Sequence, residues 1–350
     1  LHTLEFREMM TLSPGGIVTQ EVVDQLNNSA TKYVPDLQRN YAVADVEYYI
    51  DGKTEKNPVG VAGSEIEASF QIVVGRPNLL SNIEKSITEK AKLPIAGYIV
   101  GALASAAITL NEEEKELGCA FIDFGAGTTS LSVYKEGLLR KSVVIPFGGK
   151  SITKDISALN FTENDAEQLK IKFGKAMETH ESPFFSSPFS AKPDIDLTEL
   201  NRVIGLRLDE ITANIIEQIR LSGYENQLGA GIVITGGASQ LKNLNEYLVH
   251  KLKMPVRKAT AKKSYINNAP ELISNPSFTQ SLGMLLMGQE SCRFVPEEVI
   301  DDSMDYTSGK KRSESRHSVK ESKRNKKSPK PGLIERFGDV FGNMFSDEDE

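Results

Sequence analysis

Cysteine is scarce in this chain of 350 residues. Only Cys119 and Cys292 occur, far apart in the sequence, so they cannot form a disulfide framework or a metal site with several thiolates. Hydrophobic residues make up 39% and charged residues 25% of the composition. These proportions are ordinary for a globular chain of two or three domains. A disulfide-rich miniprotein is excluded, and a reducing, cytosolic setting is expected.

Long hydrophobic runs are rare as well. Residues 93–110 form an uncharged stretch that reaches the length of a membrane span. Because this stretch contains Pro94, Gly97 and Gly101 and consists mostly of small residues, we expect a buried strand followed by a closely packed helix. The chain has neither an initiator Met nor a secretory signal pattern. Its first ten residues look like a strand cut from a longer protein.

The remaining pattern predicts an α/β protein. A helix beginning at Gln20 and alternating strands at 40–50 and 65–74 form a small α+β unit at 1–75. A helix at 78–91 would place Leu79, Leu80, Ile83 and Ile87 on one face. A larger region follows, with strands expected at 119–123, 131–134 and 143–145, helices at 150–159 and 197–221, a breaker-rich loop at 181–193, and a strand, glycine turn and helix at 230–251.

The segment Phe121-Ile-Asp-Phe-Gly-Ala-Gly-Thr-Thr-Ser130 is the strongest local motif. It predicts a buried strand that ends in Asp123, followed by a turn in which Gly125 and Gly127 let backbone N–H groups approach an anion. Phosphate fits such a turn, with Asp123 near a nucleotide-bound Mg²⁺ and Thr128 donating to a phosphate oxygen. A plain hairpin with a glycine turn is the alternative for this motif alone.

A second segment, Gly231-Ile-Val-Ile-Thr-Gly-Gly-Ala-Ser-Gln-Leu241, repeats this arrangement. An apolar strand leads into a Gly236-Gly237 turn and then a helix, whose N-terminal N–H groups favour anionic or polar ligands. Neither the dinucleotide fingerprint Gly-x-Gly-x-x-Gly nor the P-loop pattern occurs, so Rossmann and P-loop folds lose support. Two such units about 110 residues apart suggest a cleft between two related halves.

Several segments in order resemble the actin-like ATPases, and more closely the FtsA family of bacterial cell-division proteins. They are Asp123-x-Gly-x-Gly-Thr-Thr, Ile145-Pro-Phe-Gly-Gly149, Ile152-Thr-Lys-Asp155, Ala166-Glu-x-Leu-Lys170 and Ile234-Thr-Gly-Gly237. The resemblance extends from about Gly16 to Gly288. It implies an actin-like two-lobed nucleotide-binding fold with an inserted α+β subdomain and a C-terminal amphipathic helix.

The resemblance also implies a domain organisation. The expected parts are an inserted subdomain at 1–75, the remainder of the first lobe at 76–117 and 278–295, a second lobe at 118–277 with a partner-binding subdomain at 175–225, a basic disordered linker at 296–331, a membrane-targeting helix at 332–346 and an acidic tail at 347–350. The first phosphate motif of the family is missing, which we interpret as an N-terminal truncation.

The ligands implied by the resemblance are ATP and Mg²⁺, with no separate protein metal site. The phosphate loop would consist of Asp123, Gly125, Ala126, Gly127 and Thr128, the ribose and base would lie beside Glu167 and Lys170, and the adenosine would lie beside Gly236, Gly237 and Ala238. A surface ion pair is the alternative interpretation of Glu167 and Lys170. Ala126, Ser130 and Gly101 depart from the family pattern. We therefore expect binding to survive better than hydrolysis, with weak or absent ATPase activity.

One arginine carries the expected partner contact. Val203-Ile-x-x-Arg207 matches a family pattern in which the arginine meets the tail of the tubulin-like ring protein FtsZ. A solvated helix charge is the alternative for Arg207. The resemblance further implies self-association into actin-like polymers and contacts with other division proteins. No nucleic-acid partner is expected.

The C-terminal region combines a basic arm with an apolar stripe. Residues 310–330 carry a net charge of +8, whereas residues 1–309 carry −10. Seven apolar residues then recur at helical spacing: Leu333, Ile334, Phe337, Val340, Phe341, Met344 and Phe345. The pattern predicts an amphipathic helix that binds a lipid surface, and docking in a protein groove is the alternative.

Together these features predict an actin-like ATP-binding protein that tethers the FtsZ ring to the cytoplasmic face of the cell membrane at the division site and recruits later division proteins. It would be a peripheral membrane protein. Two other hypotheses remain open. One is an actin-like scaffold of a pilus or secretion system. The other is a small-molecule kinase of the same fold, for which the sequence offers no convincing catalytic base.

Overall fold

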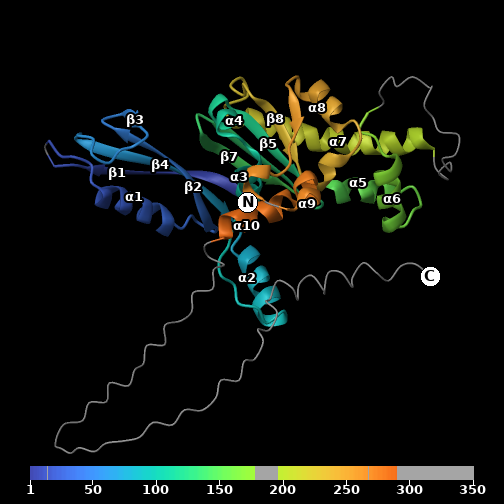
Figure 1. Ribbon diagram of the computed structural model, residues 1–350, viewed down its shortest axis with the longest axis horizontal. Coiled ribbons are helices and arrows are strands. Elements are labelled where there is room, and N and C mark those ends of the chain that lie inside the picture. The colour runs from blue at the N-terminus through green and yellow to red at the C-terminus, as the bar shows by residue number, and fades with distance from the viewer. Residues whose placement is uncertain (14, 178–195, 267, 290–350) are drawn as a thin grey trace, which may run out of the picture. The chain divides into compact units, whose positions relative to one another are not determined.

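A sheet of nine strands organises the part of the chain that the structure describes, in the order β3-β2-β4-β1-β7-β6-β5-β8-β9. The computed structural model describes residues 1–13, 15–177, 196–266 and 268–289 (Figure 1). The strands are β1 His2–Thr11, β2 Arg39–Ile50, β3 Lys53–Glu55, β4 Glu65–Gly75, β5 Cys119–Phe124, β6 Thr129–Lys135, β7 Leu138–Ile145, β8 Gly231–Thr235 and β9 Val256–Lys258.

Helices connect and cover these strands. The α-helices are α1 Gln20–Lys32, α2 Asn78–Glu84, α3 Gly101–Thr109, α4 Glu112–Leu117, α5 Gly149–Ser157, α6 Glu163–Phe173, α7 Leu197–Arg220, α8 Leu244–Leu252, α9 Pro270–Ser274 and α10 Thr279–Gly288. Shorter helices are the π-helix η1 Lys85–Lys90 and the 3₁₀ helices η3 Gly237–Gln240, η4 Lys263–Tyr265 and η5 Pro276–Phe278.

The first 75 residues build an antiparallel sheet covered by α1. The side chain of Thr19 caps α1 by accepting from Val22 N, and the helix buries Val23, Leu26 and Ala30. Alternate residues of β4, among them Ile66, Phe70 and Ile72, pack against this helix because successive strand side chains point to opposite faces. The helix and strands expected from the sequence here are confirmed.

This sheet continues into the next region through β1 and β7. The two strands pair antiparallel at His2 and Val143, and Val144 N donates to Leu1 O at 3.0 Å. Side chains extend the junction, because Asp45 Oδ2 accepts from Leu139 N at 2.7 Å. The N-terminal unit is therefore attached to the edge of β7 by both backbone and side-chain hydrogen bonds.

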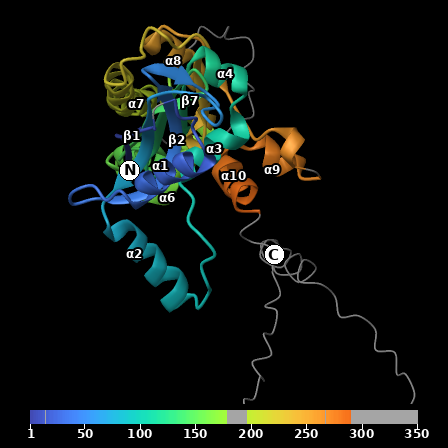
Figure 2. The ribbon, with the colours of Figure 1, turned by 90° about the vertical axis from the view of Figure 1, so that its left-hand side faces the viewer.

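Helices lie on both faces of the region built by β5 to β9, which makes it an α/β layered structure (Figures 1 and 2). Ala120, Ile122 and Phe124 of β5 pack in a core that includes α5, α7 and α8. Cys119 and Phe121 point to the other face, in a core that includes Ala106 of α3. Because both faces of β5 are covered, its sequence is a continuous hydrophobic run rather than an alternating one.

Two expectations for residues 78–110 differ from the structure. The helix at 101–109 is confirmed, but the strand expected just before it is wrong, because no described strand lies beside residues 93–100 to pair with them. The helix expected at 78–91 consists of α2 and the π-helix η1. Leu80 is buried, whereas Leu79 and Ile83 are 41% and 47% exposed, because α2 projects away from the sheet (Figures 1 and 2).

Helices α3 and α10 pack closely together through small residues. A Cβ at Gly283 would lie 2.1 Å from Ala104 O, so the two backbones are in direct contact there. This contact holds Ser105 of α3 against the end of β5, where the site described below is found.

Some predicted segments lie outside the described residues: the loop at 181–193, the linker at 296–331, the helix at 332–346 and the acidic tail. Among the helices that are described, none is both long enough and apolar enough to cross a bilayer.

Candidate functional site

The site begins where β5 and β8 end. These strands pair in parallel, with Asp123 opposite Thr235. Because neighbouring parallel strands end at the same edge of a sheet, the two glycine turns lie side by side. The sequence suggested that the two motifs belong to related halves that face each other across a cleft. That expectation is wrong, because the two motifs lie on adjacent strands of one sheet.

The first turn leaves three backbone donors free. Gly125 N donates to Thr128 O at 2.9 Å and closes the turn. Ala126, Gly127 and Thr128 are exposed, and within the described ranges no protein acceptor bonds to their N–H groups. A Cβ at Gly127 would meet no atom within 4 Å. Successive free N–H groups in a turn form a concave anion-binding site.

The first residues of helix α5 hold this turn by backbone hydrogen bonds. Gly149 N donates to Gly125 O at 3.0 Å, and Lys150 N donates to Ala126 O at 2.7 Å. A Cβ at Gly148 would lie 2.6 Å from both of these carbonyl oxygens, so only glycine fits there. The first N–H groups of α5 therefore hold the turn through its carbonyl oxygens. The N–H groups of residues 126–128 in the turn remain free.

The second turn requires glycine for a different reason. Gly236 has φ +88°, a conformation that other residues rarely adopt, and a Cβ there would lie 2.4 Å from both Asp123 Oδ1 and Phe124 O. The helix expected directly after the turn is the short 3₁₀ helix η3, and α8 begins only at Leu244. Gly236 thus lets β8 lie directly against the end of β5.

Asp123 lies beneath the two turns. Its Oδ2 accepts from Ser105 Oγ of α3 at 2.7 Å. Burial raises the pKa of Asp123, and the hydrogen bond from Ser105 opposes that rise only in part. The carboxylate is therefore held in a poorly solvated position where its charged form is disfavoured unless a cation approaches.

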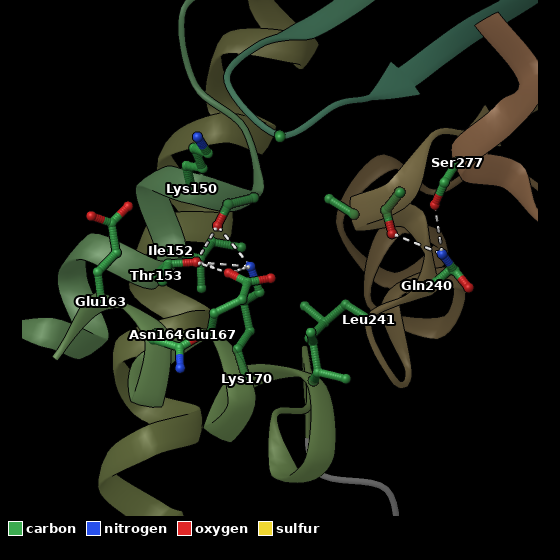
Figure 3. Close-up of a pocket in the computed structure, with 15 residues that line it drawn as sticks. Lys150, Ile152, Thr153, Glu163, Asn164, Glu167, Lys170, Gln240, Leu241 and Ser277 are labelled. Atoms are coloured by element: carbon green, nitrogen blue, oxygen red, sulfur yellow. Dashed lines mark hydrogen bonds and ion pairs between the residues drawn. The ribbon is translucent and has the colours of Figure 1, made fainter. Parts of the chain in front are cut away.

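A pocket of about 690 Å³ opens beside the turns. Helices α5 and α6 form one wall, and η3 with Ser277 forms the opposite wall (Figure 3). The lining residues are Ala126, Gly149, Lys150, Ile152, Thr153, Glu163, Asn164, Glu167, Lys170, Ile171, Gly237, Ala238, Gln240, Leu241 and Ser277. Its volume lies within the range of small-molecule and cofactor sites.

A polar cluster occupies the α5–α6 wall. Lys170 Nζ lies 2.7 Å from Glu167 Oε2 and 2.9 Å from Thr153 Oγ1, and Thr153 donates to the same Glu167 oxygen (Figure 3). Burial alone would favour the neutral form of Glu167, but the hydrogen bonds from Lys170 and Thr153 and the charge of Lys170 outweigh it and lower the pKa of Glu167. The carboxylate is therefore ionised and fixed in position.

Ten residues were predicted for the nucleotide site. Those that line the pocket are Ala126, Glu167, Lys170, Gly237 and Ala238. The other five, Asp123, Gly125, Gly127, Thr128 and Gly236, belong to the adjoining strand end and turns. The structure therefore brings residues from three separate segments to one edge of the sheet, and their roles stay predictions.

Sequence reasoning missed part of the lining. Gly149 ends the Ile145-Pro-Phe-Gly-Gly149 motif and Thr153 lies in the Ile152-Thr-Lys-Asp155 motif, and a glycine pair before a helix could have indicated that both line a site. Gln240 and Ser277 carry no such signal, because their contact at 3.1 Å joins segments 37 positions apart. Only the tertiary fold brings Gln240 and Ser277 together to form this wall of the pocket.

Arg207 lies on α7, away from the pocket lining. Its Nε and Nη2 donate to the two oxygens of Asp155 at 2.5 and 2.8 Å, and Nη1 donates to Glu210. The guanidinium also lies 5.6 Å from the centre of the Phe147 ring. Arg207 is therefore a fixed, half-buried group rather than a freely solvated charge, and a contact with a partner stays a prediction.

Comparisons with known proteins place the fold. A solved structure described as the PilM-PilN type IV pilus biogenesis complex superposes with a TM-score of 0.50 at 16% identity, covering 82% of this chain and 76% of that one. A structure of MreB5 of Spiroplasma citri bound to ADP has a TM-score of 0.43 at 16% identity, covering 70% and 88%. The protein has an actin-like α/β fold.

The family follows from sequence. The model of cell division protein FtsA matches residues 120–283, and that of the SHS2 domain inserted in FtsA matches residues 1–74. The FtsA of Escherichia coli K12 is 32% identical over 289 residues, which cover 78% of this chain and 68% of that protein. The FtsA of Porphyromonas gingivalis is 37% identical over 206 residues, which cover 57% and 43%. The chain belongs to the FtsA family of cell division proteins.

Replacing Asp123 tests the environment of the carboxylate. Because its pKa is raised on folding, the folded state binds more protons than the unfolded state just above the usual pKa of aspartate, and stability falls as pH rises through that window. Asp123→Asn removes this dependence. The free energy of unfolding of the variant minus that of the wild type should grow from about pH 4 upward.

Urea unfolding of both proteins from pH 4 to pH 8 measures the difference. Subtracting the wild-type curve cancels the titration of all other groups. A difference that stays constant over this range would show that Asp123 titrates as it does in water.

Proposed function

We propose that this chain binds ATP beside β5 and β8 and, as a member of the FtsA family, acts in cell division by linking FtsZ to the membrane. The observation that carries the nucleotide assignment is the set of three free N–H groups at residues 126–128 next to the pocket. Phosphates are the ligands that such a turn favours. Ala126 belongs to both the turn and the pocket lining, so one ligand can reach both.

The two ends of the pocket differ in chemistry, as a nucleotide requires. The turn at residues 125–128 offers backbone donors and no bulky side chain, which suits a phosphate chain. The α6 and η3 walls offer Glu167 together with the apolar side chains of Ile171 and Leu241. That end suits a ribose with its flat base.

Magnesium fits this arrangement as a companion of the nucleotide. Among the described residues, no group of three or more His, Cys, Asp or Glu side chains could hold a metal ion. Mg²⁺ that arrives with a nucleotide takes its ligands mainly from phosphates and water and needs only one or two carboxylates. Asp123 would supply that carboxylate through water, and the cation would favour its charged form.

We further propose that ATP is held with weak or absent hydrolysis. A general base must be free to take a proton from the reacting water, whereas the role proposed for Asp123 is to face the Mg²⁺ that accompanies the nucleotide. Ala126, Ser130 and Gly101 also depart from the family pattern quoted above. Binding and turnover can thus be separated in this chain.

Gly127→Ala tests the phosphate assignment. The space beside Gly127 is open, so the added methyl group should leave the free energy of unfolding within about 0.5 kcal/mol of the wild type. The same methyl group would obstruct phosphate at the free N–H groups, and we expect the ATP affinity to fall about tenfold or more, the effect of losing one hydrogen bond to a charged group.

Calorimetric titration with MgATP measures this affinity. Gly97→Ala is the matched control, because its Cβ would also meet no atom within 4 Å and it lies outside the pocket lining. Equal affinity for MgATP in the wild type and both variants would contradict the assignment of the phosphates to this turn.

The link to FtsZ rests on Arg207 and its neighbourhood on α7. Because Asp155 already fills the fork of the guanidinium, a partner must either displace that carboxylate or bind beside the pair. Arg207→Ala should therefore weaken binding of an FtsZ tail peptide about fivefold or more, the effect of losing about 1 kcal/mol of charge pairing.

Fluorescence anisotropy of the labelled peptide measures this effect. Arg202→Ala is the control, since Arg202 also lies on α7 and pairs with an acidic neighbour, Glu199, at 2.7 Å. Binding by neither the wild type nor the variants would favour the pilus-type scaffold over a protein that engages FtsZ.

The membrane link rests on the sequence of residues 332–346. Burying apolar side chains contributes about 1.5–3 kcal/mol each when burial is complete, and basic residues at an anionic surface add about 1 kcal/mol each. Deleting residues 332–350 should therefore abolish sedimentation with anionic liposomes.

Two single variants refine this test. Phe341→Ser lies in the apolar stripe and should weaken binding, whereas Asp339→Ser lies outside it and should not. Undiminished binding after the deletion would assign membrane contact to another part of the chain.

Within this proposal, the domain partition given by the sequence is retained, with residues 1–75 as the inserted subdomain. The protein would lie at the cytoplasmic face of the membrane at the division site, where it would associate with copies of itself and with other division proteins. Membership of the FtsA family favours this role over a pilus scaffold or a small-molecule kinase.

A further inference from the structure

Lys150 is the first residue of α5 that brings a side chain to the site. The two residues before it are glycines, and its backbone N–H donates to Ala126 O at 2.7 Å. This bond fixes its backbone to the turn at residues 125–128, which carries the free N–H groups described above. The side chain is exposed and lines the pocket (Figure 3). The flexible four-carbon stem of a lysine therefore begins beside the proposed phosphate site.

The ammonium of Lys150 has no hydrogen-bond or ion-pair partner among the residues that the structure describes. Lys170, the other cation of the pocket lining, differs in this respect. A lysine ammonium carries three donors, and those of Lys170 have three acceptors: Gly149 O at 3.0 Å, Thr153 Oγ1 at 2.9 Å and Glu167 Oε2 at 2.7 Å. Of these two lining cations, Lys150 is therefore the one whose donors are available to a ligand.

The charge of Lys150 reaches the interior of the pocket. Burial raises the pKa of Glu167, while hydrogen bonds and the charges of Lys170 and Lys150 lower it. Because the attraction between charges falls with distance, this effect indicates that the ammonium of Lys150 lies close enough to act on a charged group in the pocket. Glu163 and Glu167 are the carboxylates of the described lining, and neither forms an ion pair with Lys150. Lys150 therefore offers an uncompensated positive charge to an anionic ligand.

We infer that the ammonium of Lys150 binds a phosphoryl oxygen of the nucleotide at the turn, and that Lys150 thereby makes the pocket prefer phosphorylated ligands. This inference rests on the proposed binding of ATP. The N–H groups of residues 126–128 fix the position of the anion, and Lys150 adds a point charge on a flexible stem, which is how lysine binds phosphate. The sequence did not indicate any role for Lys150.

The balance of charge at this edge of the sheet explains why a lysine matters there. The turn offers only the partial charges of N–H groups, whereas a triphosphate carries several full negative charges and Asp123 lies beneath the same turns. A bound Mg²⁺ neutralises part of this charge. Lys150 adds a charge of the protein, and its contribution is absent for adenosine, which has no phosphate. The ratio of the affinities for MgATP and adenosine therefore reports on this contact.

The test uses the full chain and titration calorimetry with MgATP and with adenosine. Lys150→Met keeps a long flexible side chain and removes the charge. It should weaken the binding of MgATP about fivefold or more, as expected when an ion pair that water partly screens is lost, and leave the affinity for adenosine unchanged. Lys150→Arg keeps the charge and should retain most of the MgATP affinity. The MgATP affinity of Lys150→Met should also fall less steeply with added NaCl than that of the wild type.

Lys154→Met is the matched control. Lys154 lies one turn further along α5, it is also exposed and without a hydrogen-bond or ion-pair partner among the described residues, and it does not line the pocket. Its replacement removes the same charge from the same helix and should leave the MgATP affinity and its salt dependence as in the wild type. Because both lysines are exposed, both variants should unfold at the same urea concentration as the wild type.

The outcomes separate the inference from the proposed function. If the wild type does not bind MgATP, the proposed binding of ATP fails, and the inference fails with it. If the wild type binds MgATP but Lys150→Met binds it equally well, or loses no more affinity than Lys154→Met, Lys150 is a solvated charge and the inference alone is overturned. An equal loss of affinity for MgATP and adenosine in Lys150→Met would show a structural role and would also overturn it.

Discussion

The parallel pairing of β5 with β8 is the interaction on which the site depends. It sets Asp123 opposite Thr235 and brings two turns, about 110 residues apart in the sequence, to the same edge of the sheet. The pairing can run to the strand ends only because Gly236 has no side chain to meet Asp123 and Phe124. A local feature of one residue therefore decides whether the two motifs form one site.

The turn at residues 125–128 is held by backbone contacts rather than by side chains. Two N–H groups at the start of α5 bond to the carbonyls of Gly125 and Ala126, and Gly148 allows this close approach. The same helix carries Thr153, and Lys170 bonds back to Gly149 O. The turn at residues 125–128 and the polar cluster around Glu167 thus share α5 as a support, and a disturbance of α5 would affect both ends of the pocket.

The sequence predicted the ends of β5 and β8 with their glycine turns. It predicted less well the segments that surround them. Strands β5 and β8 carry continuous apolar runs that end in glycine turns, which are local signals with a clear physical cause. The strand expected at 93–100 was wrong because apolar composition cannot tell whether a neighbouring strand exists. Gln240 and Ser277 were missed because a wall assembled from distant segments leaves no periodic pattern in either one.

Asp123 and Glu167 show how one site treats two carboxylates differently. Asp123 is half-buried and has a single hydrogen-bond donor, so its pKa is raised and its charge needs a cation that the ligand would bring. Glu167 has a lysine and a hydroxyl as partners, so its pKa is lowered and its charge is present without any ligand. The α6 end of the pocket is thus organised in the free protein, whereas the charged form of Asp123 would be favoured only when a ligand brings a cation. Occupancy would therefore change the electrostatics at the ends of β5 and α3, and leave α6 as it was.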